Sequence, residues 1–291
     1  MITKFGKRFL AQYLAGNVRF PAQDLAVGID STAANTNGND TRLGFEFYRL
    51  PVTLGTIDIQ TDENGNSTYA VVYKTTLPQD VAGKITEIGL YPSSRDSINN
   101  FDSKFISDFE NNLVWVDENE INPEIVSTPS PRIGATMFKV EAPSSSSKEY
   151  KSKYDSFNMS GYSTNDTVTL AFNQADLNLS SIKIKFYSSD TSYLYATLNN
   201  LTTVGENIKS ISVGSLLTSG TPDLTSITKV GLEVTAKSTG TTVVYLDGLR
   251  INDEDTFDPR FGLIARSVLS STLEKKAGRP ADIEYRMGLN F

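Results

Sequence analysis

Five side chains on two adjacent predicted strands have the clearest potential to bind a ligand. The two strands flank the connection 188–192, and each alternates apolar with polar or aromatic residues. Successive side chains of a strand point to opposite faces, so the non-core positions share one face. These positions are Lys183, Lys185 and Tyr187 on the first strand and Tyr193 and Tyr195 on the second. The connection is short enough for a hairpin, which would make Tyr187 a neighbour of Tyr193.

Exposed tyrosine rings beside lysine side chains can stack on the apolar faces of sugar rings or meet acidic glycans. Tyrosine provides flat contact area at a low cost in conformational entropy. We therefore interpret Tyr187, Tyr193 and Tyr195 as candidate glycan-binding residues. The same pattern also fits cross-strand pairing that stabilises the sheet, or a contact between subunits.

The composition removes most catalytic chemistry. The sequence contains no cysteine and no histidine, which excludes disulfides, thiolate metal sites and Ser-His or Cys-His pairs. Catalysis by paired carboxylates remains open. The sequence shows no Gly-rich phosphate loop, no Gly-x-Ser-x-Gly turn and no metal-spaced ligand cluster. We therefore assign no catalytic residue, no metal ligand and no cofactor, and we expect that the protein is not an enzyme.

The predicted strand Lys84–Pro92 carries two unusual residues. Glu87 lies among apolar neighbours, and such a glutamate more often anchors backbone groups or an arginine, such as Arg49 or Arg266, than it catalyses. Gly89 has no side chain to pack, which indicates that another segment approaches closely there.

Charge and hydropathy restrict the partners. The formal net charge of −7 over 291 residues opposes the phosphate backbone of nucleic acids. No segment is long and apolar enough to span a bilayer, and the first residues lack the hydrophobic region of a signal peptide. We expect synthesis in a cytoplasm and no membrane insertion.

The apolar periodicity predicts a mainly β protein with an N-terminal helix. Apolar residues at three- and four-residue spacing predict a helix from Thr3, its cap, to about Leu14. Asn64–Gly65 is a strong signal for a hairpin turn. Alternating residues predict strands at 25–29, 45–60, 68–76, 84–92, 113–116 and 282–287.

A change of composition at Ala142–Lys148 predicts a domain boundary. Short alternating strands then recur every ten to fifteen residues or so, a pattern typical of a β-sandwich. We predict a discontinuous β-rich scaffold domain formed by residues 1–142 and 254–291, with a sandwich at 150–253 inserted between its two parts.

Several motifs resemble tail-fibre, collar and baseplate proteins of tailed bacteriophages. Lys84–Pro92 matches their I-x-E-I/V-G-L-Y strand almost residue for residue. The match covers about the first 140 and about the last 40 residues, and departs at Asp30, where that group has a glycine. The other matching segments, in the order of that group, are 3–16, 24–30, 41–49, 262–266 and 282–286.

The middle of the chain resembles the jelly-roll carbohydrate-binding modules. The matching segments are 158–162, 182–187, 224–232 and 244–251, and Gly248 replaces an aspartate of the family's closing strand. The resemblance implies a jelly-roll β-sandwich, which in that group serves as a sugar-binding module or as a spacer. It also makes Asp247 a position for a structural calcium ion, but one aspartate supplies only one of about six oxygen ligands. The acidic residues at 253–258 are more typical of a solvated turn.

These resemblances imply a structural component of a tailed-phage virion, in the tail, collar, baseplate or fibre. The partners would be other virion proteins, further copies of the chain and host-surface glycans. A capsid decoration or head-fibre protein is one alternative. The binding module of a glycan-degrading enzyme is another.

Overall fold

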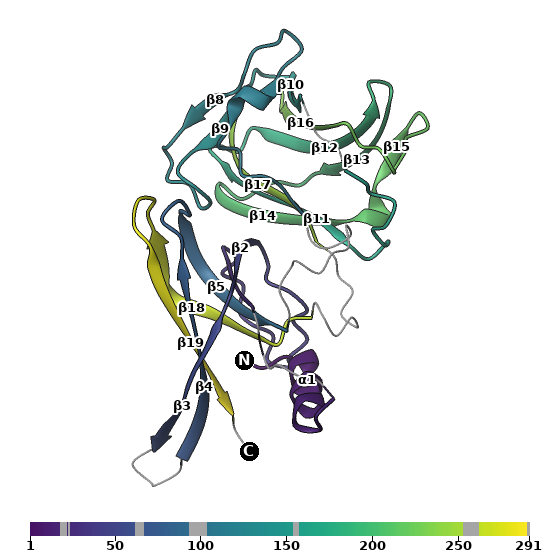
Figure 1. Ribbon diagram of the computed structural model, residues 1–291. Helices are drawn as coiled ribbons and strands as arrows, with labels where there is room; N and C mark the ends of the chain where they lie inside the picture. The colour runs from purple at the N-terminus through teal and green to yellow at the C-terminus, as the bar shows by residue number, and fades with distance from the viewer. Residues whose placement is uncertain are drawn as a thin grey trace. The chain divides into compact units, whose positions relative to one another are not determined.

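The computed structural model describes residues 1–17, 22, 24–61, 67–92, 104–153, 157–252 and 262–289. The chain divides into two compact units, the first formed by Met1–Ile98 with Asp255–Phe291 and the second by Asn99–Glu254. Strands dominate both units, and the described residues contain a single α-helix, near the N-terminus, so the predicted mainly β class is confirmed (Figure 1). The predicted Asn64–Gly65 turn and the acidic residues at 253–258 lie outside the described residues.

The first unit combines segments from both ends of the chain. Its four-stranded sheet has the order β18-β5-β1-β2, and its three-stranded sheet has the order β19-β4-β3. The elements are α1 (Lys4–Leu14), β1 (Asp24–Gly28), β2 (Glu46–Pro51), β3 (Thr53–Thr61), β4 (Ser67–Leu77), β5 (Gly83–Tyr91), β18 (Ala265–Lys275) and β19 (Ala281–Leu289). The C-terminal strands therefore add to sheets that the N-terminal segment begins.

The helix α1 packs against its own unit. The Thr3 hydroxyl caps it by accepting a hydrogen bond from the Gly6 backbone N–H at 2.9 Å, as predicted. Gly6 faces the backbone of Ile264 so closely that a Cβ would lie 2.0 Å from the carbonyl oxygen. Phe9 is buried in the same core as the sheet residues Leu25 and Leu90.

Glu87 is the buried anchor between the two ends of the chain. Its carboxylate accepts backbone N–H groups of Gly44 at 3.1 Å and Phe45 at 3.0 Å. It also binds the Arg266 guanidinium at 2.9 Å, so Arg266 rather than Arg49 is its arginine partner. A Cβ on Gly89 would lie 2.8 Å from the Leu263 side chain, which is the close approach expected there.

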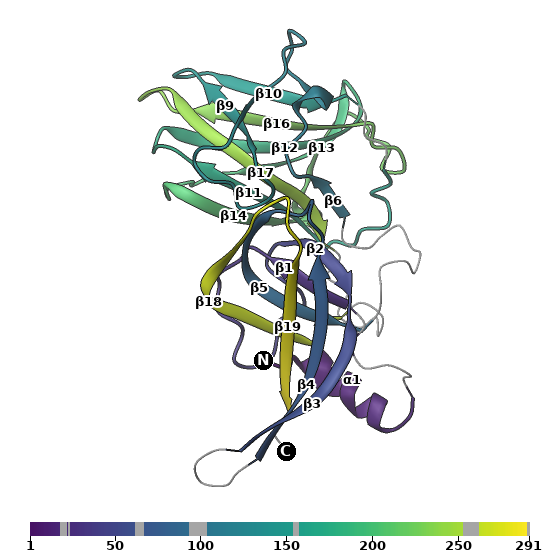
Figure 2. The ribbon, with the colours of Figure 1, turned by 60° about the vertical axis from the view of Figure 1, so that its left-hand side comes forward.

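The second unit is a β-sandwich of two sheets. One has the order β15-β13-β12-β16-β10-β7, and the other has the order β14-β11-β17-β9-β8, with β6 pairing β17 (Figure 2). The strands are β6 (Lys104–Ser107), β7 (Trp115–Val116), β8 (Glu124–Val126), β9 (Met137–Ala142), β10 (Ser147–Ser152), β11 (Thr167–Gln174), β12 (Leu179–Ser189), β13 (Ser192–Leu198), β14 (Gly205–Ser212), β15 (Leu217–Ser219), β16 (Lys229–Ala236) and β17 (Thr242–Asn252), with short 3₁₀ turns at Asn112–Val114 and Val213–Ser215. Trp115 is 3% exposed in the core between the sheets.

The predicted boundary at residue 142 is wrong. Strand β9, which ends at Ala142, pairs with β17, and β10 pairs with β16, so residues 104–153 and 157–252 belong to the sandwich. The Ser-rich segment after Ala142 is the turn that leads from one sheet to the other, and Ser145 adopts a left-handed conformation there with φ of 58°. The composition marks this turn rather than a domain boundary.

Candidate functional site

The β12–β13 hairpin brings the predicted tyrosines together on the outer face of the sheet. Tyr187 pairs with Tyr193 across the hairpin, and their ring centroids lie 4.8 Å apart. Tyr195 lies next along β13, with its ring centroid 5.9 Å from that of Tyr193. The predicted hairpin and the predicted neighbours are therefore both present.

Tyr187 is nevertheless covered and does not form an open stacking surface, so that part of the prediction is wrong. Its side chain lies across β16 over Gly231, where a Cβ would lie only 2.8 Å from the ring. Its hydroxyl donates a hydrogen bond of 2.6 Å to Glu149 on β10, and the residue is only 2% exposed. Burial and the contact with the carboxylate raise the pKa of the Tyr187 hydroxyl.

Lys185 is also buried on this face, between two carboxylates. Its ammonium lies 2.6 Å from a Glu233 oxygen and 3.2 Å from a Glu149 oxygen. Burial disfavours the charged amine, but the bonds to these carboxylates outweigh it and raise the pKa of Lys185. Glu233 is likewise desolvated, yet the bonds from Lys185 and Lys183 lower its pKa. The ion pairs therefore hold Lys185, Glu149 and Glu233 in fixed positions.

Tyr193 and Tyr195 remain half-buried, and each ring has a lysine above it. The Lys185 ammonium lies 5.6 Å from the centroid of the Tyr193 ring, and the Lys183 ammonium lies 5.6 Å from that of Tyr195. Such cation–π contacts fix the orientation of the rings. These two tyrosines, rather than Tyr187, offer the accessible aromatic surface of the hairpin.

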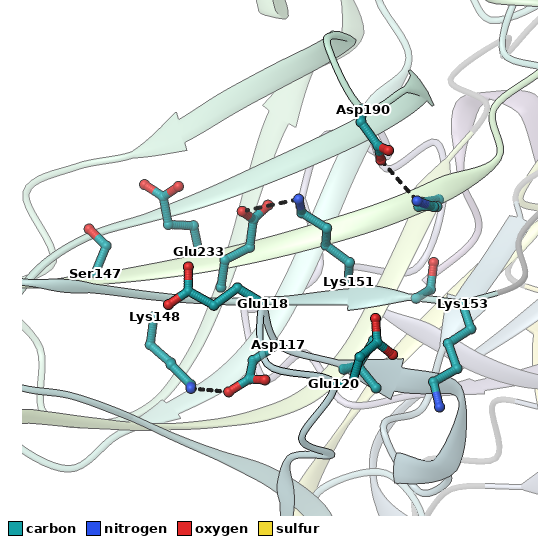
Figure 3. Close-up of a pocket in the computed structure, with 13 residues that line it drawn as sticks. Asp117, Glu118, Glu120, Ser147, Lys148, Lys151, Lys153, Asp190 and Glu233 are labelled. Atoms are coloured by element: carbon teal, nitrogen blue, oxygen red, sulfur yellow. Dashed lines mark hydrogen bonds and ion pairs between the residues drawn. The ribbon is translucent and has the colours of Figure 1, made fainter.

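A groove of about 740 Å³ lies on the same face, over β10 and β16. The loop that follows β7 forms one side of it, and Asp190 of the β12–β13 turn lies at the other (Figure 3). This volume is within the usual range for small-molecule sites. The lining side chains are mostly charged: Asp117, Glu118, Glu120, Lys148, Glu149, Lys151, Lys153, Asp190, Lys229 and Glu233.

Some of these charged side chains form ion pairs with other described residues, and others do not. Lys148 binds Asp117, and this hydrogen bond holds the pKa of the Asp117 carboxyl below its usual value. Lys229 binds Asp190 at 2.9 Å. Within the part of the chain that the structure describes, the exposed side chains of Glu118 and Glu120 make no ion pair. The groove therefore presents unpaired carboxylates beside a fixed polar floor.

Asp247 is an anchor for a neighbouring segment. The residue is 2% exposed, and its carboxylate accepts hydrogen bonds from the backbone N–H groups of Arg132 at 2.8 Å and Ile133 at 3.2 Å. Burial raises its pKa to about 7. These contacts are hydrogen-bond donors rather than the oxygen ligands that calcium requires. Among the described residues, no group of three or more acidic side chains is arranged to hold a metal ion.

The sequence did not predict the contribution of β10 and β16 to this face. Glu149 and Lys151 alternate with the buried Tyr150, a strand signal that the neighbouring Ser-rich segment obscured. Gly231 and Glu233 lie on a strand that the sequence did predict, but their position beside β12 and β10 depends on non-local pairing. No sequence pattern indicated that the loop after β7 would form one side of a groove.

Comparison with known proteins yields similarities to solved structures alone, because no protein-family model and no curated protein matches the chain. One is a family 11 carbohydrate-binding module from Clostridium thermocellum in complex with a β-1,3-1,4-mixed-linked tetrasaccharide. It is 16% identical, with a TM-score of 0.37 over 53% of this chain and 97% of the module. A non-crystalline-cellulose-specific module of family 28 is 13% identical, with a TM-score of 0.36 over 53% of this chain and 98% of the module. An agarase is 10% identical, with a TM-score of 0.37 over 52% of this chain and 24% of the enzyme.

Among the described residues, no helix is long and apolar enough to cross a membrane.

Proposed function

We propose that the second unit binds carbohydrate on the outer face of the β15-β13-β12-β16-β10-β7 sheet. The observation that carries the proposal is the groove of about 740 Å³ over β10 and β16, on the face that also bears Tyr193 and Tyr195. Sugars present many hydroxyl groups around small apolar ring faces. Carboxylates and ammonium groups in a groove bind hydroxyls, and an adjacent aromatic ring packs on the ring face.

The floor of the groove favours such binding because it is organised before a ligand arrives. Glu149 and Glu233 are held by Lys185, with Tyr187 bound to Glu149. Side chains that are already ordered lose little further entropy on binding. Tyr187 thus acts as a positioning residue beneath the site, and Tyr195 is the residue that we expect to contact the sugar.

The first unit would attach this binding face to a larger assembly. The sequence motifs of β5 and of the flanking segments support a virion protein of a tailed phage, in the tail, collar, baseplate or fibre. In that setting the chain is made in the host cytoplasm, resides in the virion, and contacts other virion proteins. A capsid decoration or head-fibre protein is equally compatible with the motifs.

The binding module of a glycan-degrading enzyme would bind sugar in the same way. One observation bears instead on catalysis by this chain itself, namely the two carboxylates side by side in the groove. Glu149 and Glu233 pair directly across β10 and β16. Glycoside hydrolysis, however, needs one carboxyl group that is protonated at neutral pH, and the pKa of Glu233 is lowered. The Lys185 ammonium lies within 3.2 Å of both carboxylates, so it occupies the space between them. We therefore propose binding without turnover.

The experiment is calorimetric titration of the full chain with soluble oligosaccharides from bacterial capsules, cell walls and β-glucans. We expect Tyr195→Ala to weaken binding about tenfold, because losing an aromatic contact with the sugar costs about 1.4 kcal/mol. Tyr245→Ala is the matched control, since Tyr245 is also half-buried but belongs to β17 of the other sheet.

Equal affinities of the two variants, or no binding by the wild-type chain, would refute a site on this face. Release of reducing sugars during incubation would instead support the enzyme.

A further inference from the structure

Strand β3 of the first unit leaves both an edge and an apolar face uncovered. It is the last strand in the order β19-β4-β3, so one of its sides has no strand beside it among the described residues. The side chains of Leu54, Ile57 and Ile59 are 58%, 68% and 57% exposed. A long apolar edge strand of this kind is a template for pairing with another chain.

A bulge in β3 places these three side chains on one face of the sheet. The register shifts between Leu54 and Ile57, so that two residues of β3 lie opposite Val72. Tyr69 of β4 lies opposite Ile59 on the same face and is 42% exposed. At β19 this apolar face is covered, because Tyr285 belongs to the core and is only 6% exposed. At β3 the same face is uncovered. Figure 1 shows the three strands side by side as one twisted ribbon.

The charge pattern distinguishes the two edges of this sheet. Strand β19 alternates Asp282, Glu284 and Arg286, and charges of this kind protect an edge from pairing. Strand β3 has one charged residue, Asp58. Arg286 reaches across β4 and binds Asp58 at 2.8 Å, so the chain itself neutralises the charge that would repel a partner.

We propose that β3 pairs in an antiparallel manner with β3 of a second copy of this chain, joining the two three-stranded sheets across a two-fold axis. In a register centred on Ile57, that residue lies opposite its own counterpart and Asp58 lies opposite Thr56. Ile59 lies opposite Gly55, where a Cβ would point toward Val72 on the other face of the sheet, so nothing at this position obstructs Ile59. No like charges face each other, and the apolar side chains of both copies share one face. A register centred on Asp58 would oppose two carboxylates and is disfavoured.

The test is sedimentation velocity of the full chain over a range of concentrations. We compare the wild-type chain with the double variant Ile57→Lys/Ile59→Lys and with Val204→Lys. Val204 is 51% exposed in the second unit and serves as the matched control. We expect the wild-type chain and the control to dimerise alike, and the dissociation constant of the double variant to rise at least about tenfold. Circular dichroism verifies that each variant is folded.

A wild-type chain that stays monomeric, or a folded double variant that dimerises as the wild type does, would overturn the proposal. Hydrogen exchange of the wild-type chain gives a readout that needs no variant. The proposal requires the backbone amides of Thr53–Thr61 to gain protection as protein concentration rises, and unchanged protection contradicts it. Neither readout involves sugar, so this proposal stands or falls independently of glycan binding.

Discussion

Replacing Glu87 with glutamine should selectively destabilise the first unit. Glu87 is fully buried, and its carboxylate joins the N-terminal segment to the C-terminal one through Arg266. The substitution keeps the shape of the side chain but removes its charge, which leaves the Arg266 guanidinium without its nearest anion. Asp40 at 3.5 Å and Asp30 at 3.7 Å remain at longer range.

The expected loss follows from these contacts. Breaking a buried ion pair by neutralising one partner costs about 3–5 kcal/mol. The two remaining aspartates compensate in part, so we expect about 3 kcal/mol. With an m-value of about 2 kcal/mol/M, this loss lowers the urea midpoint by roughly 1.5 M.

The assay is urea unfolding followed by circular dichroism and by tryptophan fluorescence. Trp115 is the only tryptophan in the chain and lies in the second unit, so its fluorescence reports that unit separately. Glu284→Gln is the control, because Glu284 is exposed and pairs with Lys74 at 3.3 Å on the surface. We expect little change in the control and a large shift of the dichroism-detected transition in Glu87→Gln. Equal midpoints for Glu87→Gln and Glu284→Gln would refute the anchoring role of Glu87.

Three further predictions concern the sandwich. Gly231→Val should cost about 1–3 kcal/mol in urea unfolding, because the new side chain displaces Tyr187 and Glu149; an unchanged midpoint would contradict their close packing. Tyr187→Phe should lower the free energy of unfolding by about 1 kcal/mol by removing the hydrogen bond to Glu149, and an unchanged urea midpoint would contradict that contribution. Folding raises the pKa of the Asp247 carboxyl from 3.8 to about 7, so the folded state binds the carboxyl proton more tightly than the unfolded state does. The free energy of unfolding should therefore fall by up to roughly 4 kcal/mol as the pH rises from about 4 to about 7. Asp247→Asn should lack this slope in unfolding measured across that range, and a persistent slope would assign it to other groups.

Local signals predicted the elements well. Thr3 and the apolar spacing gave a helix that ends at Leu14, as α1 does. Alternation gave the β12–β13 hairpin and the pairing of Tyr187 with Tyr193. Gly89 indicated a close approach, and the side chain of Leu263 lies there. In each case the information lies within a few residues of the element concerned, or in a residue type with one dominant structural use.

Features that depend on distant pairing were beyond such reasoning. The burial of Tyr187 requires Gly231 on the adjacent strand and Glu149 on the strand beyond it, and neither position can be read from the hairpin. The domain boundary was misplaced because β9 pairs with β17, about a hundred residues later in the sequence. The groove requires the loop after β7 to lie beside β10. Strands β7 and β10 pair through only two residues each, which is too short a pattern to predict from the sequence.

The central claim is that sugar binds on the outer face of the sheet, from β10 across β16 and β12 to β13. Hydrogen exchange with and without a saturating oligosaccharide tests this claim most directly. We expect backbone amides in Ser147–Ser152, Ser192–Leu198 and Lys229–Ala236 to gain protection when the oligosaccharide is bound. Protection confined to the first unit, or to the sheet that contains β17, would contradict the claim.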